Sequence, residues 1–209
     1  MKAEQPYIHH CAVIILAGGK SARLGKPKQL LKFNGKTFLQ HALDTAELAG
    51  LGPVIVVLGS QKSILERGIS GNNVLILENK NWEEGMASSI RAGVEKIKQL
   101  SGDIDGTVIM VCDQPFVSPD LLNTLLITQR ETGKAVVASS YESIAGTPVI
   151  FHQSVFAQLM ELKGEKGARK FLEQNPELVA TISFPAGKTD IDTIEDYEKL
   201  KMEERNPAT

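Results

Sequence analysis

The chain has 209 residues, of which 42% are hydrophobic and 23% charged, values that fit one α/β domain with a substantial core. The formal net charge of −2 gives the protein no overall attraction to nucleic acid or to anionic membranes, so we expect neither as a partner and expect any bound anion to be held locally. The two cysteines lie in or beside apolar runs and no apolar leader is visible, which favours reduced thiols and a cytoplasmic protein.

Short apolar runs alternate with helical patterns along the chain. Strands are predicted at residues 12–17, 53–58, 74–77, 107–112, 135–139, 148–151 and 179–184. Helices are predicted at residues 38–49, 63–69, 87–100, 154–162 and 168–173, after the cap Ser118, and from residue 193. Because the strands are continuous apolar runs, both faces of their sheet should be covered. This predicts an α/β fold, a three-layer α/β/α sandwich with a mostly parallel, Rossmann-like sheet.

We expect a single domain over residues 11–200, with flexible tails at 1–10 and 201–209.

A glycine-rich and basic loop, LAGGKSARLGKPK (residues 16–28), leaves the first predicted strand. Gly18 and Gly19 let backbone N–H groups approach an anion, and Arg23, Lys26 and Lys28 place three cations within six residues. The loop indicates a triphosphate partner, although two glycines alone also fit an ordinary turn. Neither a P-loop nor the dinucleotide fingerprint is present, which argues against a Rossmann dehydrogenase.

Two acidic motifs are candidates for a Mg²⁺ site, since Mg²⁺ prefers one or two carboxylates together with phosphate oxygens. Asp113 follows the fourth long apolar run in CDQP (residues 112–115), and Asp192 lies in DIDT (residues 190–193) before the last helix. Each has a simpler interpretation: Asp113 fits a turn or cap before proline, and Asp192 or Thr193 fits a helix cap. Capping and metal binding do not exclude each other. The four histidines do not form a metal-binding set.

A further motif, NKNWEEGMASSIRAG (residues 79–93), leads into a predicted helix. Gly85 gives close backbone access, and Ser88 and Ser89 lie where a helix N-terminus presents free N–H groups. Such a place can bind a base edge or a ribose. An ordinary helix cap is the alternative, and Trp82 is interpreted as a packing or lid residue.

The string LAGGKSARLGKPKQLL, followed in order by the motifs at 79–93, 112–115, 146–151, 164–172 and 190–197, resembles the nucleotidyltransferases with a glycosyltransferase-A-like fold. It is most similar to the molybdenum cofactor cytidylyl- and guanylyltransferase group, over residues 11–200. The resemblance implies a Mg²⁺-dependent enzyme that transfers CMP or GMP from an NTP to a phosphorylated small-molecule acceptor, molybdopterin in this group, and releases pyrophosphate. It also implies a molybdoenzyme or its chaperone as a further partner.

The resemblance assigns roles residue by residue. Those implied to bind the nucleotide are Leu16, Ala17, Gly18, Gly19, Lys28, Asn79, Gly85 and Ser89. Those implied to be catalytic are Arg23, Lys28 and Asp113, and those implied to bind the metal are Asp113 and Asp192. Residues 146–148 and 164–169 are implied to lie on the acceptor side.

Three features stay open at this point. Ala17-Gly18-Gly19 is similar to the guanylyl members, whereas residues 28–31 (KQLL) and 86–93 are similar to the cytidylyl members, so the base is not predicted. A sugar or isoprenoid phosphate is an alternative acceptor. A non-catalytic, nucleotide-binding maturation partner of a molybdoenzyme is an alternative function, although the presence of both Asp113 and Asp192 favours an enzyme. The oligomeric state and the number of metal ions are not predicted.

Overall fold

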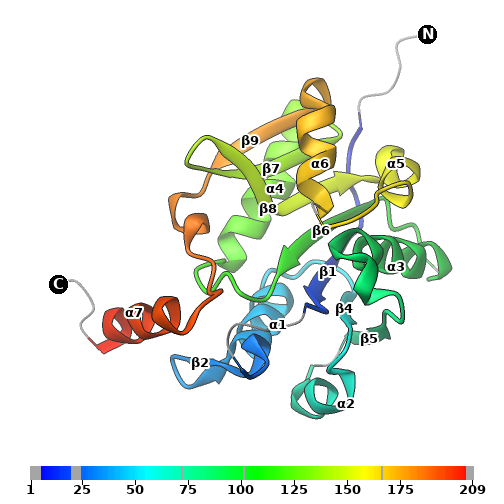
Figure 1. Ribbon diagram of the computed structural model, residues 1–209. Helices are drawn as coiled ribbons and strands as arrows, with labels where there is room; N and C mark the ends of the chain where they lie inside the picture. The colour runs from blue at the N-terminus through cyan, green and yellow to red at the C-terminus, as the bar shows by residue number, and fades with distance from the viewer. Residues whose placement is uncertain (1–5, 20–24, 72, 101, 166, 206–209) are drawn as a thin grey trace, which may run out of the picture.

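The computed structural model describes residues 6–19, 25–71, 73–100, 102–165 and 167–205, which build one seven-stranded sheet with helices on both faces (Figure 1). The strands are β1 (Cys11–Ala17), β4 (Val54–Leu58), β5 (Val74–Glu78), β6 (Gly106–Val111), β7 (Val136–Tyr141), β8 (Ile144–His152) and β9 (Val179–Ser183). Their order across the sheet is β5-β4-β1-β6-β8-β7-β9. The predicted mostly parallel α/β sheet is confirmed.

Strand direction divides the sheet into two parts. β5, β4, β1 and β6 are parallel, as expected for strands that are joined by helical crossovers. β8 is antiparallel to both β6 and β7, because a tight turn at Glu142 and Ser143, both with positive φ, returns the chain directly beside β7. The sequence predicted only residues 148–151 of β8. Its first half, IAGT, is too polar to show as an apolar run.

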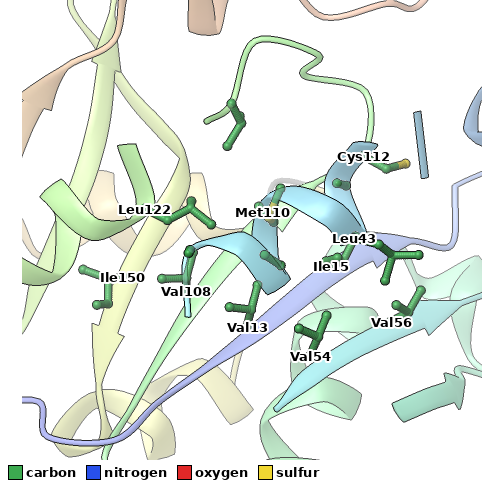
Figure 2. Packing of buried hydrophobic residues seen from close by; sticks show 14 of the residues in the cluster. Val13, Ile15, Leu43, Val54, Val56, Val108, Met110, Cys112, Leu122 and Ile150 are labelled. Atoms are coloured by element: carbon green, nitrogen blue, oxygen red, sulfur yellow. The ribbon is translucent and has the colours of Figure 1, made fainter. Parts of the chain in front are cut away.

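The helices form the two outer layers. α1 (Phe38–Leu48) and α4 (Pro119–Thr132) cover the face of β1 that carries Val13 and Ile15. Figure 2 shows this packing, with Leu43 and Leu122 directed at the sheet. α3 (Met86–Gln99), α5 (Phe156–Met160) and α6 (Gly167–Gln174) cover the opposite face. The predicted three-layer sandwich is therefore confirmed, and every residue of β1 is buried.

The remaining elements are short. α2 (Lys62–Leu65) follows β4, and single turns of 3-10 helix lie at η1 (Lys28–Leu30), η2 (Glu66–Gly68), η3 (Trp82–Glu84), η4 (Gln153–Val155), η5 (Pro176–Leu178) and η6 (Pro185–Lys188). Part of the N-terminal segment packs on α4: the backbone N–H of Ile8 donates to Gln129 (3.1 Å), and Arg130 donates to the Ile8 carbonyl (2.8 Å). Among the described residues, every helix is too short or too polar to cross a bilayer.

Besides the two hydrophobic clusters on the faces of the main sheet, a third and smaller hydrophobic cluster lies beside them. β2 (Lys32–Phe33) and β3 (Lys36–Thr37) form a hairpin, and the C-terminal helix α7 (Ile194–Arg205) packs on it. Figure 1 shows α7 next to β2, away from the seven-stranded sheet. The buried residues of this cluster are Leu31, Phe33, Phe38, Ile191 and Leu200. The sequence predicted α7 but not the hairpin, whose two-residue strands are too short for a periodic pattern.

Candidate active site

A cavity of about 490 Å³ opens at the carboxyl ends of β1 and β6, the edge where open α/β sheets bind ligands. Its lining includes most of the residues predicted to bind a nucleotide: Leu16, Ala17, Gly18, Gly19, Lys28, Gly85 and Ser89. Asp113 also lines it. The motifs that the sequence pointed to separately therefore meet around one space. The predicted catalytic Arg23 lies within residues 20–24, outside the described residues.

The glycine loop after β1 is held by two residues that the sequence did not single out. Gln29 is buried, and its Nε2 donates to the carbonyl oxygens of Ala17 (2.9 Å) and Gly19 (3.4 Å). Gly59, which follows β4, lies so close that a Cβ there would overlap the Gly18 carbonyl and lie 2.9 Å from Trp82 Cβ. The only sequence signal for Gln29 is a polar residue between apolar neighbours in KPKQLL.

Lys28 lies between two carboxylates that are far apart in the sequence. Its ammonium donates to Asp113 and, at 3.0 Å, to Asp192. Burial alone would lower the pKa of Lys28, but the charges and hydrogen bonds of the two carboxylates outweigh it and raise the pKa above its ordinary value. The Asp113 side chain is 12% exposed and that of Asp192 is 49% exposed. Asp113 thus forms the inner side of this cluster and Asp192 the outer side.

Neither carboxylate serves as the helix cap that the sequence left as an alternative. Ser118 caps α4 by accepting from the Leu121 N–H. At the start of α7, Thr193 and Asp196 form a reciprocal box: Asp196 accepts from the Thr193 N–H (3.0 Å), and Thr193 Oγ1 accepts from the Asp196 N–H (3.1 Å). Asp192 precedes this box, and its carboxylate is directed at Lys28.

The charges of this cluster do not cancel. Asp190 is a third carboxylate nearby, and its pKa is raised to about 6, first by loss of surrounding water and then by the charges of Asp113 and Asp192. No ready-made group of three or more acidic, histidine or cysteine ligands occurs among the described residues. Two carboxylates plus the phosphate oxygens and water of a bound ligand are the donor set that Mg²⁺ prefers. The residues present fit a divalent cation that arrives with a phosphorylated ligand.

Asn79 organises the start of α3 from outside the cavity lining. The residue is buried, and its Nδ2 donates to the hydroxyls of Ser88 (2.7 Å) and Ser89 (3.0 Å). Its Oδ1 accepts from the Asn81 N–H (3.0 Å). Only Ser89 of these residues lines the cavity. Asn79 therefore contacts the proposed nucleotide space through Ser89.

Gly85 brings the predicted nucleotide and acceptor motifs together. It has φ of 95°, and a Cβ there would lie 2.7 Å from the carbonyl carbon of Gly164. The Gly164 carbonyl accepts from the Ala87 N–H (3.1 Å) in the first turn of α3. Glu165 consequently lines the cavity, as do Met86 and Glu83. Sequence spacing could not reveal this, because Gly85 and Gly164 are distant in the chain.

Gln114 links residues 146–148, one of the two predicted acceptor segments, to the carboxylate cluster. Its Oε1 accepts from the Thr147 hydroxyl (3.1 Å), and its Nε2 donates to the Gly187 carbonyl (3.0 Å). The end of β6, the middle of β8 and the segment before Asp190 are thereby fixed together. Residues 146–148 lie beside Asp113 through this contact, whereas none of them lines the cavity.

Residues 13–179 match the family of the MobA-like NTP transferase domain. Among curated proteins, nicotine blue oxidoreductase of Paenarthrobacter nicotinovorans is 30% identical, covering 90% of this chain and 94% of its own. Purine catabolism protein PucB of Bacillus subtilis is 31% identical with the same coverage. A probable molybdenum cofactor guanylyltransferase of Bacillus mycoides is 34% identical over 61% of this chain and 60% of its own.

Solved structures agree with these matches. The crystal structure of Rv0371c from Mycobacterium tuberculosis is similar with a TM-score of 0.77 and 30% identity, covering 92% of this chain and 97% of that chain. A crystal structure of the same protein in complex with manganese is similar with a TM-score of 0.73 and 27% identity, covering 92% and 98% of the two chains. The predicted nucleotidyltransferase fold with a glycosyltransferase-A-like sheet is confirmed.

Proposed function

Because the chain belongs to the MobA-like NTP transferase family, we propose that it transfers CMP or GMP from an NTP to a phosphorylated acceptor and releases pyrophosphate. The observation that carries the proposal is the contact of Lys28 with both Asp113 and Asp192 beside the glycine loop. Lys28 and Asp113 line the cavity beside Gly18 and Gly19, and Asp192, from a distant part of the chain, contacts the same lysine. This arrangement suits a triphosphate better than an uncharged ligand.

The chemistry is in-line attack by an acceptor phosphate oxygen on the α-phosphorus. One P–O bond forms, the bond between the α-phosphorus and the bridging oxygen breaks, and that oxygen leaves with pyrophosphate. No general base is needed, since a phosphate monoester is already an anion near neutral pH. Two anions approach each other, so the barrier is mainly electrostatic. Lys28 holds its proton in this site and stabilises the charge that builds on the transferred phosphoryl group.

Asp113 and Asp192 would hold a divalent cation, Mg²⁺ in our proposal, which when bound neutralises charge on the phosphates. The manganese complex of Rv0371c supports a divalent cation in a protein with this fold. Gln29 and Gly59 keep the glycine loop in place, and Gly18 and Gly19 leave room for the phosphates. Gly85 and Ser89 line the part of the cavity proposed for the nucleoside.

We propose molybdopterin as the acceptor, as the resemblance to molybdenum cofactor nucleotidyltransferases implies. The relative with a molybdenum cofactor guanylyltransferase name supports this choice. A sugar or isoprenoid phosphate is the alternative acceptor for the same chemistry. A molybdoenzyme or its chaperone is the proposed receiver of the product.

The assay measures pyrophosphate release with each NTP, Mg²⁺ and each acceptor class. We expect release with GTP or CTP plus molybdopterin, and an increase in melting temperature with that NTP and Mg²⁺, since a bound ligand stabilises the native state. Pyrophosphate release only with a sugar or isoprenoid phosphate would show that this phosphate, and not molybdopterin, is the acceptor. NTP binding without release under any combination would favour a carrier, and NADH oxidation without NTP binding would overturn the transferase.

The first prediction concerns Lys28 and Asp113. Lys28→Ala and Asp113→Ala each remove one preorganised charge, which should cost on the order of 3–4 kcal/mol, or roughly 10²–10³ in kcat. Lys36→Ala is a matched control, because Lys36 is an exposed lysine on β3 that pairs with Asp44 of α1 and does not line the cavity. Steady-state kinetics and circular dichroism on the three variants check the prediction. Unchanged kcat in either folded Lys28 or Asp113 variant contradicts it.

A further inference from the structure

The two proposed metal carboxylates are placed by different parts of the molecule. Asp113 follows β6 in the main sheet, within the family match to residues 13–179. Asp192 lies after that match, between η6 and α7, and none of the strands carries it. The segment before it is anchored to the main domain: Ile191 donates its N–H to the Asp113 carbonyl (3.4 Å), and the Gly187 carbonyl accepts from Gln114 (3.0 Å). These contacts hold the chain on one side of Asp192, and the chain that follows Asp192 supplies a constraint on the other side.

The docking of α7 on the β2–β3 hairpin supplies that constraint. Ile191 and Leu200 are buried against Leu31, Phe33 and Phe38 in the third cluster. The hairpin directly follows η1, which begins at Lys28. Asn34 at the hairpin turn donates its N–H to Glu204 near the far end of α7 (2.7 Å). The hairpin thus connects the lysine side and the carboxylate side of the site.

Tyr197 forms the centre of this contact. Its hydroxyl donates to the Lys32 carbonyl (2.8 Å) and accepts from the Lys32 N–H (3.3 Å), so it pairs with both backbone groups of one β2 residue. Its ring meets Phe38 edge to face, with centroids 6.3 Å apart. Lys26 of the basic loop lies over the same ring, with Nζ 5.8 Å from its centroid. One side chain therefore touches β2, α1 and the loop proposed to bind phosphates.

We propose that Tyr197 is a positioning residue for the transfer reaction. It fixes the register of α7 against the hairpin and so keeps Asp192 against Lys28. The inference rests on the proposed function, because it assigns a reason to the place of the second carboxylate. Substitution should disturb the reaction more than the fold, since the two main core clusters do not include Tyr197.

The test is a double-mutant cycle of Tyr197→Leu and Asp192→Asn in the full chain, with kcat and the Mg²⁺ concentration for half-maximal rate as readouts. A misplacement of about 1 Å can cost roughly 10²-fold, so we expect Tyr197→Leu to lower kcat by roughly 10- to 100-fold and to raise the Mg²⁺ requirement. In the Asp192→Asn background the Tyr197 substitution should lower kcat by no more than about twofold, because the carboxylate through which Tyr197 acts is already absent. Tyr197→Phe, which keeps the ring beside Phe38 and Lys26, should lie between wild type and Tyr197→Leu.

Hydrogen–deuterium exchange gives a readout that does not require turnover. Residues 194–205 should exchange faster in Tyr197→Leu, with strands β1 and β6 unchanged. Tyr7→Leu is the control, since Tyr7 is an exposed tyrosine under Arg130 in the N-terminal segment. It should leave kcat and α7 exchange unchanged. If Tyr197→Leu does not fold, the same cycle is run with Tyr197→Phe.

The outcomes separate the two proposals. Fully additive losses in the cycle, or wild-type kcat with unchanged α7 exchange, overturn the role of Tyr197 and leave the transferase intact. Wild-type kcat in Asp192→Asn removes the second carboxylate from the mechanism and overturns the inference with it. Faster α7 exchange in a protein whose wild type releases no pyrophosphate with any NTP supports the α7 constraint while the transferase proposal fails.

Discussion

At Gly59 the missing side chain allows two loops to touch. The Gly18 carbonyl and Trp82 Cβ occupy the space that a Cβ at Gly59 would need, so the glycine loop and η3 close against each other there. The φ of Gly59 lies outside the left-handed region, and the requirement is therefore one of space alone. Any larger residue pushes the glycine loop out of the position that lines the cavity.

We predict that Gly59→Ala lowers the free energy of unfolding by about 1–3 kcal/mol, the usual cost of overpacking, and reduces the NTP-dependent increase in melting temperature. Gly68→Ala is the matched control, because Gly68 has no atom within 4 Å of an added Cβ and no positive φ. It should be neutral or slightly stabilising. Differential scanning fluorimetry with and without NTP and Mg²⁺ checks both variants. Equal behaviour of the two alanine variants would show that Gly59 imposes no constraint.

The residues of the candidate site differ in how visible they were in the sequence. Gly18, Gly19 and Lys28 stand in one compact motif, so their local chemistry was readable. Gln29 and Gly59 were not foreseen, because their importance comes from contacts with another segment rather than from their own neighbours. The residues around a polar side chain or a glycine do not indicate which distant loop will contact it in the folded protein.

At the scale of elements, α4 follows local rules closely. Ser118 caps it, Pro119 occupies the first position, and Gly133 ends it in the left-handed conformation. None of its residues lines the cavity. Its cap should therefore affect stability without affecting the reaction.

We predict that Ser118→Ala lowers the free energy of unfolding by about 1 kcal/mol, since the Leu121 N–H loses its acceptor. For a chain of this size the melting temperature should fall by about 2–4 °C. Ser118→Thr keeps a hydroxyl acceptor and should lie close to wild type. Thermal melting and kcat of the three proteins check the prediction, and a loss of kcat in folded Ser118→Ala would show that α4 affects the site.

Elements with strong periodicity were predicted from sequence, and elements defined by pairing were not. β1, β4 and β6 are continuous apolar runs because helices cover both of their faces. β8 depends on a hairpin turn with two non-glycine residues at positive φ, which composition does not reveal. The β2–β3 hairpin is stabilised by α7 from the far end of the chain, and no local pattern reports such a partner.

At the scale of the whole molecule, the buried thiols connect stability to pH. Cys11 lies at the start of β1, and burial raises its pKa from an ordinary 9.0 to about 12. The native thiol stays protonated where the unfolded thiol ionises. Stability that is fully present below about pH 9 is therefore lost as the pH rises toward about 12.

We predict that the unfolding free energy of the wild type falls with pH more steeply than that of Cys11→Ala above pH 9. One thiol contributes a slope of at most about 1.4 kcal/mol per pH unit. Urea denaturation at intervals from about pH 7.5 to about pH 10.5, a range that spans the ordinary thiol pKa, measures the unfolding free energy of both proteins and checks the difference between them. Parallel curves would mean that the Cys11 thiol ionises equally in both states.

The Lys28 contact also has a consequence for the order in which ligands load. Without substrate, the lysine acts as an internal counterion for Asp113 and Asp192. A free divalent ion would have to displace that ammonium from both carboxylates without supplying a new partner for it. An ion chelated by a nucleotide brings the compensating anion along, because the triphosphate accepts the displaced lysine. In our proposed function, the protein therefore binds the metal ion and the nucleotide as one complex. The nucleotide-free protein has little tendency to bind the metal ion alone.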